Sequence, residues 1–237
     1  MKILLKNITR KYGKKVVIDN LSWSIDLEKE NIIALIGSNG AGKTTLLKII
    51  SGIYTFESGN ISTSEGEEDY FSWARDNISF LQSGDRGLRY RNSVYDNVKY
   101  YGAIKGINPN KTEELYEKYN KFLSMEEFRD RKIGDLSTGE KKKAALLCAL
   151  CSGNKILILD EPSDGLDISA KIELQKIIKE ISISQETKFI ISTHDIEFIS
   201  NIADTYAFIK NGNIKYENIS SMDIEEIRSK FLEVNSL

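Results

Sequence analysis

Residues 37–45 read Gly-Ser-Asn-Gly-Ala-Gly-Lys-Thr-Thr, which fits the pattern G-x-x-x-x-G-K-[ST]. Glycines in such a loop let successive backbone N–H groups approach a chain of phosphates closely. The ammonium of Lys43 can reach the β- and γ-phosphates, and the hydroxyl of Thr44 can bind Mg²⁺. The stretch predicts a phosphate-binding loop whose members are Gly37, Ser38, Asn39, Gly40, Ala41, Gly42, Lys43, Thr44 and Thr45.

The segments on either side of this loop favour the same interpretation. Residues 31–36 form a nearly continuous apolar run, which is typical of a buried parallel strand. After the loop, Leu46, Ile49, Ile50 and Ile53 recur at helical spacing. Bound phosphates would therefore lie at a helix N-terminus, where backbone N–H groups and the helix dipole attract anions.

Composition limits the class of protein. With 237 residues and 41% hydrophobic content, the chain can bury the core of one large domain or two small ones. The 33 basic and 35 acidic residues nearly balance, so the global charge does not indicate nucleic-acid binding. No apolar stretch approaches the roughly 20 residues that span a bilayer, and the N-terminal residues lack the pattern of a signal peptide. We expect a cytoplasmic location.

The rest of the chain is expected to alternate between strands and helices. Residues 2–30 resemble short antiparallel strands, with turns at 12–13 and 19–20. Residues 93–151 are mostly helical in pattern, and strands at 155–160 and 188–193 flank an amphipathic helix at 168–183. The spacing in that helix points four isoleucines inward, namely Ile172, Ile177, Ile178 and Ile181. Cys148 and Cys151 form a C-x-x-C pattern, which we interpret as part of a buried helix rather than a redox or zinc pair.

Two carboxylates end the strand at 155–160. Ligands of α/β folds bind at the carboxyl ends of the strands, so Asp160 is placed to hold Mg²⁺ and Glu161 to orient and polarise an attacking water. The same pattern also fits an ordinary strand end with solvated acids. Its position beside a phosphate-binding loop favours the catalytic interpretation.

The order of motifs along the chain resembles that of the ATP-binding subunits of ABC transporters. The motifs are the phosphate-binding loop, Gln82, Leu136-Ser-Thr-Gly-Glu140, Ile156-Leu-Ile-Leu-Asp-Glu-Pro162 and Thr193-His-Asp195. The resemblance covers essentially the whole chain. It implies an α/β fold with a P-loop NTPase core, an N-terminal antiparallel β subdomain and a helical insert. Residues 1–237 would form one ABC ATPase domain, with a nucleotide-binding core at 1–84 and 152–237 and a helical signature subdomain at 85–151.

The five-residue signature is the most specific part of the resemblance. In the family, the signature of one protomer closes over the γ-phosphate held by its partner, which assigns that role to Ser137, Thr138, Gly139 and Glu140. The commonest form is L-S-G-G-Q, so Thr138 replaces a glycine and Glu140 a glutamine. The serine and glutamate also fit a capping box at the start of a helix.

Four further residues take roles from the resemblance. Tyr12 would stack on adenine, and Gln82 would contact Mg²⁺ and water in a loop that senses the membrane subunit. Asp167 would lie in the loop that crosses the dimer interface, and His194 would reach the γ-phosphate and help to fix Glu161. Each residue also has a plain structural interpretation: a half-buried strand tyrosine, a strand-end glutamine, a helix N-cap and a structural histidine.

The resemblance implies an ATPase that uses ATP and Mg²⁺, with Lys43, Glu161 and His194 as the catalytic residues. Two copies would face each other head to tail and drive a separate membrane-spanning permease, at the inner face of the cell membrane. Residues 87–101 resemble those of exporter-type subunits for drugs, antimicrobial peptides or polysaccharides. An importer subunit is the alternative, followed by a non-transport ABC ATPase that acts on nucleic acid or ribosomes. Tyr90 and Tyr95 are the candidates for an exposed aromatic pair that receives the permease, and the alternative is that these tyrosines belong to the core.

Overall fold

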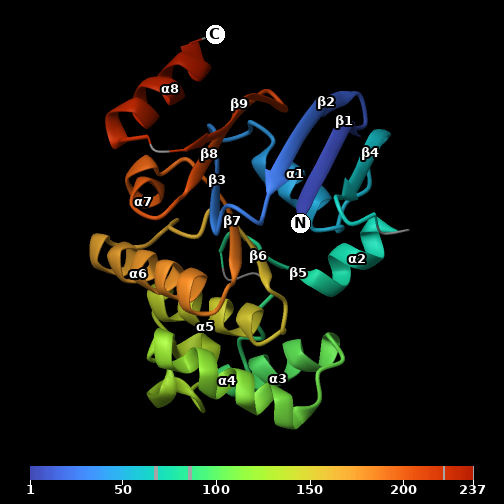
Figure 1. The fold of residues 1–237 in the computed structure, drawn as a ribbon. Coiled ribbons are helices and arrows are strands. Elements are labelled where there is room, and N and C mark those ends of the chain that lie inside the picture. Colours follow the sequence, from blue (N-terminus) through green and yellow to red (C-terminus); the bar gives the residue numbers. More distant parts are fainter. Residues whose placement is uncertain (67–68, 85–86, 221, 237) are drawn as a thin grey trace.

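A computed structural model describes residues 1–66, 69–84, 87–220 and 222–236. Its centre is a six-stranded sheet in the order β5-β6-β7-β3-β8-β9 (Figure 1). The strands are β5 (Ile78–Leu81), β6 (Ile156–Asp160), β7 (Lys188–Thr193), β3 (Ile32–Ile36), β8 (Thr205–Lys210) and β9 (Asn213–Ser220). All neighbours pair in parallel except β8 and β9, which form an antiparallel hairpin. The carboxyl ends of β3, β5, β6 and β7 therefore meet at one edge.

A second sheet is antiparallel and has the order β2-β1-β4. Its strands are β1 (Lys2–Tyr12), β2 (Lys15–Asp26) and β4 (Ser58–Thr63). The turn predicted at 12–13 joins β1 to β2, but the turn predicted at 19–20 is wrong because β2 runs through it. Asn20 adopts a φ of 45° within the strand, next to a register shift between Ile8 and Arg10 of β1. The polar pair is thus an irregularity within a strand and not a chain reversal.

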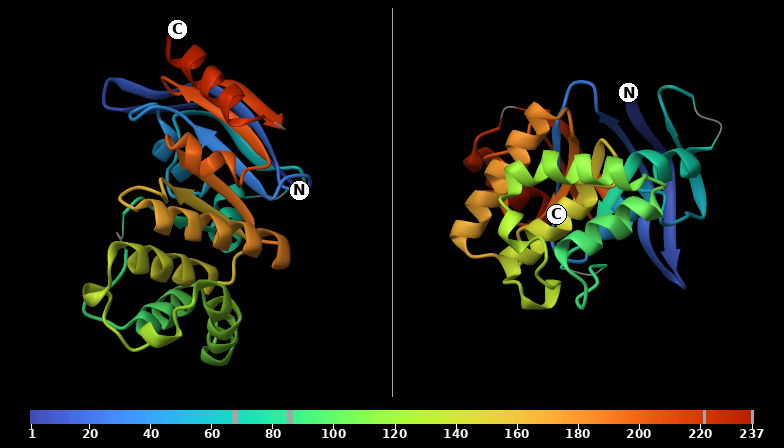
Figure 2. Two further views of the ribbon diagram at one scale, coloured as in Figure 1. Left: turned by 90° about the vertical axis from the view of Figure 1, so that its left-hand side faces the viewer. Right: turned by 90° about the horizontal axis from the view of Figure 1, so that it is seen from below.

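The helices cover both faces of the central sheet. Helix α1 (Lys43–Ile50) lies between the two sheets, near α2 (Tyr70–Asn77). Helices α3 (Val94–Ile104), α4 (Pro109–Leu123) and α5 (Thr138–Leu150) gather at the opposite end (Figures 1 and 2). Short 3₁₀ turns at Glu126–Phe128 and Ile133–Asp135 link α4 to α5. The remaining helices are α6 (Ile168–Ser184), α7 (Ile196–Ser200) and α8 (Ile224–Ser236).

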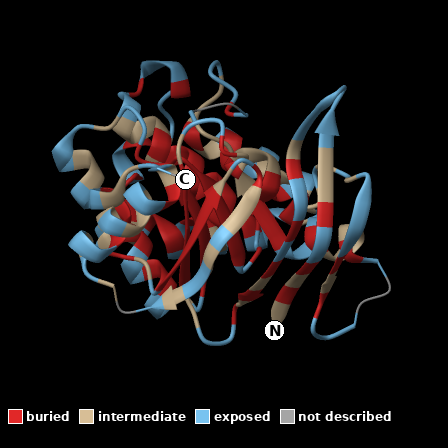
Figure 3. Ribbon diagram, turned by 90° about the horizontal axis from the view of Figure 1, so that it is seen from above, coloured by how far each residue is buried: buried red, intermediate tan, exposed pale blue. Residues whose placement is uncertain are grey.

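Two apolar clusters hold these layers together. On the central strands, Ile33 and Leu35 face the cluster shared with α1 and the antiparallel sheet, whereas Ile32 and Ala34 face the helices α3 to α6. This alternation follows from the two-residue period of a strand that is buried on both faces. Figure 3 shows the buried residues concentrated on the central strands.

One predicted core position is wrong, and one residue predicted to continue the helix after the phosphate-binding loop lies beyond its end. Ile172 is 45% exposed, and Leu174 is buried in its place beside the correctly predicted Ile177, Ile178 and Ile181. Ile53 is 53% exposed because α1 ends at Ile50 and Gly52 turns the chain with a φ of 72°. Among the helices that the structure describes, none combines the length and the apolar character needed to cross a membrane.

Candidate nucleotide-binding and catalytic site

The loop between β3 and α1 is shaped by close backbone contacts. A Cβ atom at Gly37 would lie 2.6 Å from the carbonyl oxygen of Ile209, so a larger residue would displace the neighbouring strand. Gly42, the N-cap of α1, has a φ of 106°, and a Cβ there would lie 3.1 Å from the carbonyl oxygen of Val17. The loop is thus held between β8 and β2, with the N-terminus of α1 directly behind it. This is the geometry in which backbone N–H groups bind phosphate.

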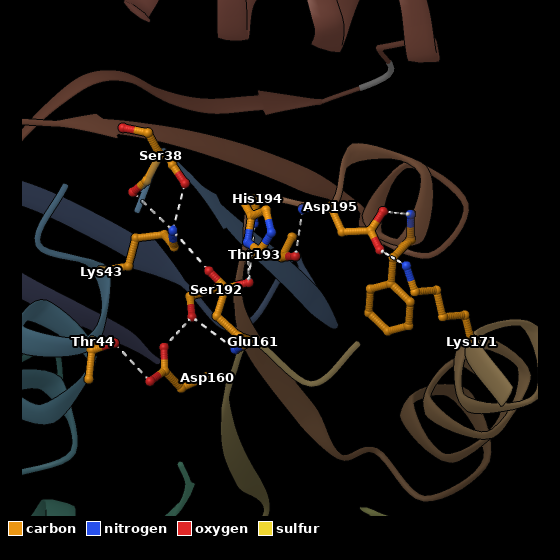
Figure 4. Close-up of polar contacts among 12 residues, drawn as sticks. Ser38, Lys43, Thr44, Asp160, Glu161, Lys171, Ser192, Thr193, His194 and Asp195 are labelled. Atoms are coloured by element: carbon orange, nitrogen blue, oxygen red, sulfur yellow. Dashed lines mark hydrogen bonds and ion pairs between the residues drawn. The ribbon is translucent and has the colours of Figure 1, made fainter. Parts of the chain in front are cut away.

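Lys43, the first residue of α1, is turned back over the loop. Its ammonium donates to the carbonyl oxygens of Gly37 at 2.6 Å and Ser38 at 3.2 Å, and lies 2.9 Å from Oε1 of Glu161 (Figure 4). Lys43 and Glu161 are only 5% and 7% exposed. A buried charge requires a partner, and this ion pair supplies one to each side chain and aims both at the same space.

Thr44 and Asp160 meet on the other side of the loop. The Thr44 hydroxyl donates to Oδ2 of Asp160 at 2.8 Å, and the Ser192 hydroxyl donates to Oδ1 at 2.6 Å (Figure 4). Hydroxyl and carboxylate oxygens are the hard ligands that Mg²⁺ prefers. Gln82, at the end of β5, borders a small pocket together with Asp160. Thr44 and Asp160 are therefore in direct contact, Gln82 shares a pocket wall with Asp160, and the oxygen donors of all three are of the kind that Mg²⁺ prefers.

Glu161 is held in an unusual conformation by β7. Its φ of 49° is rare for a residue other than glycine and costs of order 1–3 kcal/mol. Its backbone N–H donates to the carbonyl oxygen of Ser192 at 3.0 Å, and Oε2 lies 2.9 Å from Nδ1 of His194. The His194 backbone N–H donates to the same Oε2 at 3.2 Å. Glu161 is thus fixed between Lys43 and His194, with the histidine ring partly exposed (Figure 4).

Two features of this site were missed from the sequence. Ser192 touches both acids, and its only signal was a polar residue directly after the buried apolar run at 189–191. Lys171 donates to Asp195 at 2.6 Å, while Asp195 caps the N-terminus of α7 through Phe198. These contacts fix the segment that follows β7 and so the position of His194 (Figure 4).

Glu161, Asp164 and His194 also bring possible metal-ligating atoms within 4.8 Å of one another. The Lys43 ammonium already lies on Glu161, and a second cation beside it would be repelled. We assign no metal to this group.

The signature residues lie at the start of α5. Ser137 is its N-cap, and the predicted capping box is present: the Ser137 N–H donates to Oε2 of Glu140 at 2.7 Å, and the Glu140 N–H donates to Oγ of Ser137 at 3.3 Å. The Ser137 N–H lowers the pKa of the Glu140 carboxyl. Together with Thr138 and Gly139, these residues border a concave surface that also includes Asp167.

Asp167 caps α6, as its plain structural interpretation suggested, because its carboxylate accepts from the Ala170 N–H at 2.8 Å. Lys143 of α5 pairs with Glu173 of α6 at 3.0 Å. The signature surface, defined by residues 137–140 and Asp167, is therefore fixed to α6 while Ser137, Thr138 and Asp167 stay exposed.

The model of the ABC transporter family matches residues 19–164, which is more than half of the chain. This chain belongs to the ABC transporter family. The tungstate uptake system ATP-binding protein TupC of Peptoclostridium acidaminophilum is 32% identical over 214 residues, which cover 90% of this chain and 97% of TupC. The lantibiotic transport ATP-binding protein SrtF of Streptococcus pyogenes is 32% identical over 227 residues, which cover 94% of each chain.

Solved structures show the same fold. The structure of cbiO1 from Clostridium perfringens, described as part of the ABC transporter complex cbiONQ, aligns with a TM-score of 0.82 and 25% identity. The alignment covers 96% of this chain and 90% of cbiO1. The predicted fold, a P-loop NTPase core with an antiparallel β subdomain and a helical insert, is thereby confirmed. The chain is an ATP-binding subunit of the ABC type and an ATPase.

Tyr12 and the two cysteines of this ABC ATPase take no part in the contacts around Asp160 and Glu161 described above. Tyr12 ends β1 and is 44% exposed, so its ring is accessible. Cys148 and Cys151 are buried thiols on and just after α5, and burial raises the pKa of both. They behave as small core residues, which agrees with the interpretation made from the sequence.

The prediction that Tyr90 and Tyr95 form an exposed pair is wrong for Tyr95. Its ring packs on Tyr116, with centroids 5.1 Å apart, and the guanidinium of Arg129 lies 3.8 Å from its ring centroid. Tyr90 is exposed, but its ring faces Lys141 on the signature helix. A groove beside Gln82 has a mixed lining, with apolar side chains that include Ile53, Phe71, Leu88, Tyr101 and Ile104 and polar ones that include Arg75 and Lys105.

Proposed function

We propose that this chain hydrolyses Mg²⁺-ATP at the site around Lys43 and Glu161 and that hydrolysis powers transport through a separate membrane-spanning protein. The observation that carries the proposal is the contact chain in which Glu161 lies between the Lys43 ammonium and the His194 ring. Thr44 and Asp160 would hold Mg²⁺, with Gln82 bordering them. The metal would supply charge neutralisation at the phosphates.

Catalysis would rest on positioning and charge stabilisation, as in phosphoryl transfer generally. The backbone N–H groups of residues 37–45 would bind the phosphates. Lys43 would exchange its contact with Glu161 for phosphate oxygens, which frees Oε1 to accept a hydrogen bond from the attacking water. His194 would keep Oε2 in place and reach toward the γ-phosphate. Ser192 would hold Asp160 in the orientation that Mg²⁺ requires.

The site is proposed to be completed by the signature surface of a second copy of the chain. Ser137 offers a hydroxyl and Gly139 a backbone N–H at the N-terminus of α5, where a γ-phosphate would be attracted. Thr138 and Glu140 border the same surface, and Asp167 would cross the interface. The exposure of this surface supports an arrangement in which the partner's phosphate-binding loop covers it.

The membrane-spanning partner is proposed to dock in the groove between α2, α3 and β5. Its apolar side chains, bordered by polar ones such as Arg75 and Lys105, suit a short amphipathic helix inserted as an anchor. Gln82 borders both this groove and the pocket that contains Asp160. A shift in the docked helix would therefore move Gln82 relative to Asp160, and this movement would couple hydrolysis to transport.

Export remains our proposal for direction and rests on residues 87–101 alone. Import is the second candidate, because TupC, named for tungstate uptake, is as similar to this chain as SrtF, named for lantibiotic transport. Transport measured in vesicles with the partner protein would decide between the two directions.

The proposed function is tested by Lys43→Ala. Removing the ammonium should abolish measurable ATP turnover, while the far-ultraviolet circular dichroism remains that of the wild type. Turnover at the wild-type rate in a folded Lys43→Ala protein would overturn the assignment of this site.

Docking is tested separately by Ile104→Asp, which places a charge in the groove. The tagged variant should lose co-sedimentation with membranes and keep ATP binding. Leu232→Asp, at an exposed apolar position of α8 outside the groove, is the matched control. Unchanged membrane association of Ile104→Asp would place docking elsewhere.

A further inference from the structure

The ring of Tyr12 is packed against a second tyrosine that follows the phosphate-loop helix. Tyr54 meets it edge to face, with ring centroids 6.3 Å apart and planes at 73°. The backbone N–H groups of Ile53 and Tyr54 both donate to the carbonyl oxygen of Lys48, at 2.9 and 3.0 Å. Tyr54 is therefore fixed to the C-terminal end of α1, and an edge-to-face pair of this kind restrains the Tyr12 ring.

A cation lies against both rings. The guanidinium carbon of Arg10 is 5.2 Å from the Tyr12 centroid and 5.7 Å from the Tyr54 centroid. Nη1 of Arg10 lies 3.3 Å from Oε1 of Glu57, whose Oε2 accepts from the Lys11 N–H at 2.9 Å. Lys48 adds a second cation 5.0 Å from the Tyr54 centroid. The result is a bracket, made of Arg10, Tyr54 and Glu57, that holds one side of Tyr12.

This bracket is connected to the phosphate site through the β1–β2 hairpin. Tyr12 pairs with Lys15 in that hairpin, and Val17, two residues further along β2, touches Gly42 at the start of α1. A nucleotide with its phosphates at the N-terminus of α1 would thus lie beside the hairpin that carries Tyr12.

We propose that Arg10, Tyr54 and Glu57 are positioning residues that hold Tyr12 as a stacking platform for the purine base. The inference rests on the proposed function, since it needs a nucleotide in this site. Edge-to-face packing limits rotation of the Tyr12 ring, so less conformational freedom is lost when a base stacks on its accessible face. The Arg10 cation draws electron density from the ring, which favours stacking with an electron-rich purine.

The test compares ATP with inorganic tripolyphosphate, which has the phosphates but no base. Binding of both to the full chain is measured by isothermal titration calorimetry. Tyr54→Ala should weaken ATP binding by about threefold to tenfold, the range expected for one aromatic pair, and leave tripolyphosphate binding unchanged. Tyr54→Phe keeps the ring and should bind ATP like the wild type.

Arg10→Met is a second variant that keeps the side-chain length and removes the charge. It should weaken ATP binding by a smaller factor, again without affecting tripolyphosphate. Wild-type ATP affinity in both Tyr54→Ala and Arg10→Met, or an equal loss for both ligands, would overturn the inference and leave the proposed function standing. Failure of the wild type to bind either ligand would overturn both.

Discussion

The phosphate-binding half of the site and the signature surface differ in how completely the chain surrounds them. Lys43, Asp160 and Glu161 are buried, and each contacts another member of the site through a short polar contact. The signature residues Ser137 and Thr138 are exposed, and their contacts are those of a helix cap. One half is preorganised by the fold, whereas the other is presented at the surface.

The two halves of the site are therefore formed in different steps, one by folding of a single chain and the other by association of two chains. Folding of one chain fixes the acids and the lysine, because β3, β6 and β7 end at one edge of the sheet. In the proposed dimer, the signature surface gains its partner only when two chains associate. We therefore expect substitutions in the buried half to affect chemistry most strongly and substitutions in the signature surface to affect association.

The largest effect is expected for Glu161→Gln. The amide keeps the size of the side chain but removes the charge that polarises water, so kcat should fall by roughly 10²- to 10⁴-fold, as for loss of a general base. ATP binding should persist, and an ATP-bound dimer should accumulate in size-exclusion chromatography. Turnover like that of the wild type would show that Glu161 is not the catalytic carboxylate.

A smaller effect is expected for Ser192→Ala. This change removes the 2.6 Å hydrogen bond to Asp160, and hydrogen bonds to charged groups contribute about 1.5–3 kcal/mol. A loss of roughly tenfold or more in kcat, measured at saturating Mg²⁺-ATP, should result.

The matched control for Ser192→Ala is Ser182→Ala, since Ser182 is a buried serine on α6 whose hydroxyl donates to a backbone carbonyl. If both variants keep full activity, Ser192 does not position Asp160 for the reaction.

The smallest effect is expected for Glu140→Gln. The glutamine amide can still accept from the Ser137 N–H, so the cap persists and the unfolding free energy should change by less than about 1 kcal/mol. In the proposed dimer this change removes a negative charge beside the partner's γ-phosphate, so it should strengthen ATP-dependent dimerisation by about twofold to fivefold, a modest electrostatic gain at an exposed site. Light scattering with titrated ATP measures it, and weaker dimerisation would contradict the proposed role of this surface.

The capping contact should also respond to pH. The pKa of Glu140 is lowered in the folded chain by the Ser137 N–H, so its contribution to stability is present above the unfolded-state pKa. That contribution is lost as pH falls through the folded-state pKa. Glu140→Gln should remove this part of the acid sensitivity in thermal melts recorded at falling pH.

Much of the buried half could be predicted from the sequence because its residues follow strand ends. The apolar runs of β3, β6 and β7 marked one sheet edge, and the resemblance supplied the roles. The role of Ser192 was not predicted, because a single serine in a buried strand is too weak a signal to indicate a contact with the two acids. The contacts of Arg10 and Tyr54 with Tyr12 were missed for a different reason. Arg10 lies on β1 and Tyr54 in the turn after α1, and only the folded structure brings both side chains to the Tyr12 ring.

The presence of helices in the insert was predicted from the sequence, but the exposure of individual side chains on them was not. Helices at 93–151 were expected, and α3, α4 and α5 are present. Tyr95 of α3 was predicted to be exposed, but its ring packs against Tyr116 and Arg129, which lie 21 and 34 residues further along the chain. Helical spacing within α3 does not reveal contacts with such distant residues. Ile172 was misassigned for a different reason: it lies five residues before Ile177, which places it beside the buried face of α6, and Leu174 is the residue at helical spacing.

The most direct test of the central claim, that two chains share each site, mixes two chains that both carry Glu161→Gln. One also carries Ser137→Arg, which blocks the signature surface, and the other Lys43→Ala, which disables the phosphate loop. Alone, neither should form ATP-bound dimers. Mixed in equal amounts, they can form dimers with one intact site, and light scattering should detect an ATP-dependent dimer that retains one ATP per two chains. A mixture that stays monomeric with ATP, while the Glu161→Gln chain alone dimerises, would contradict the account.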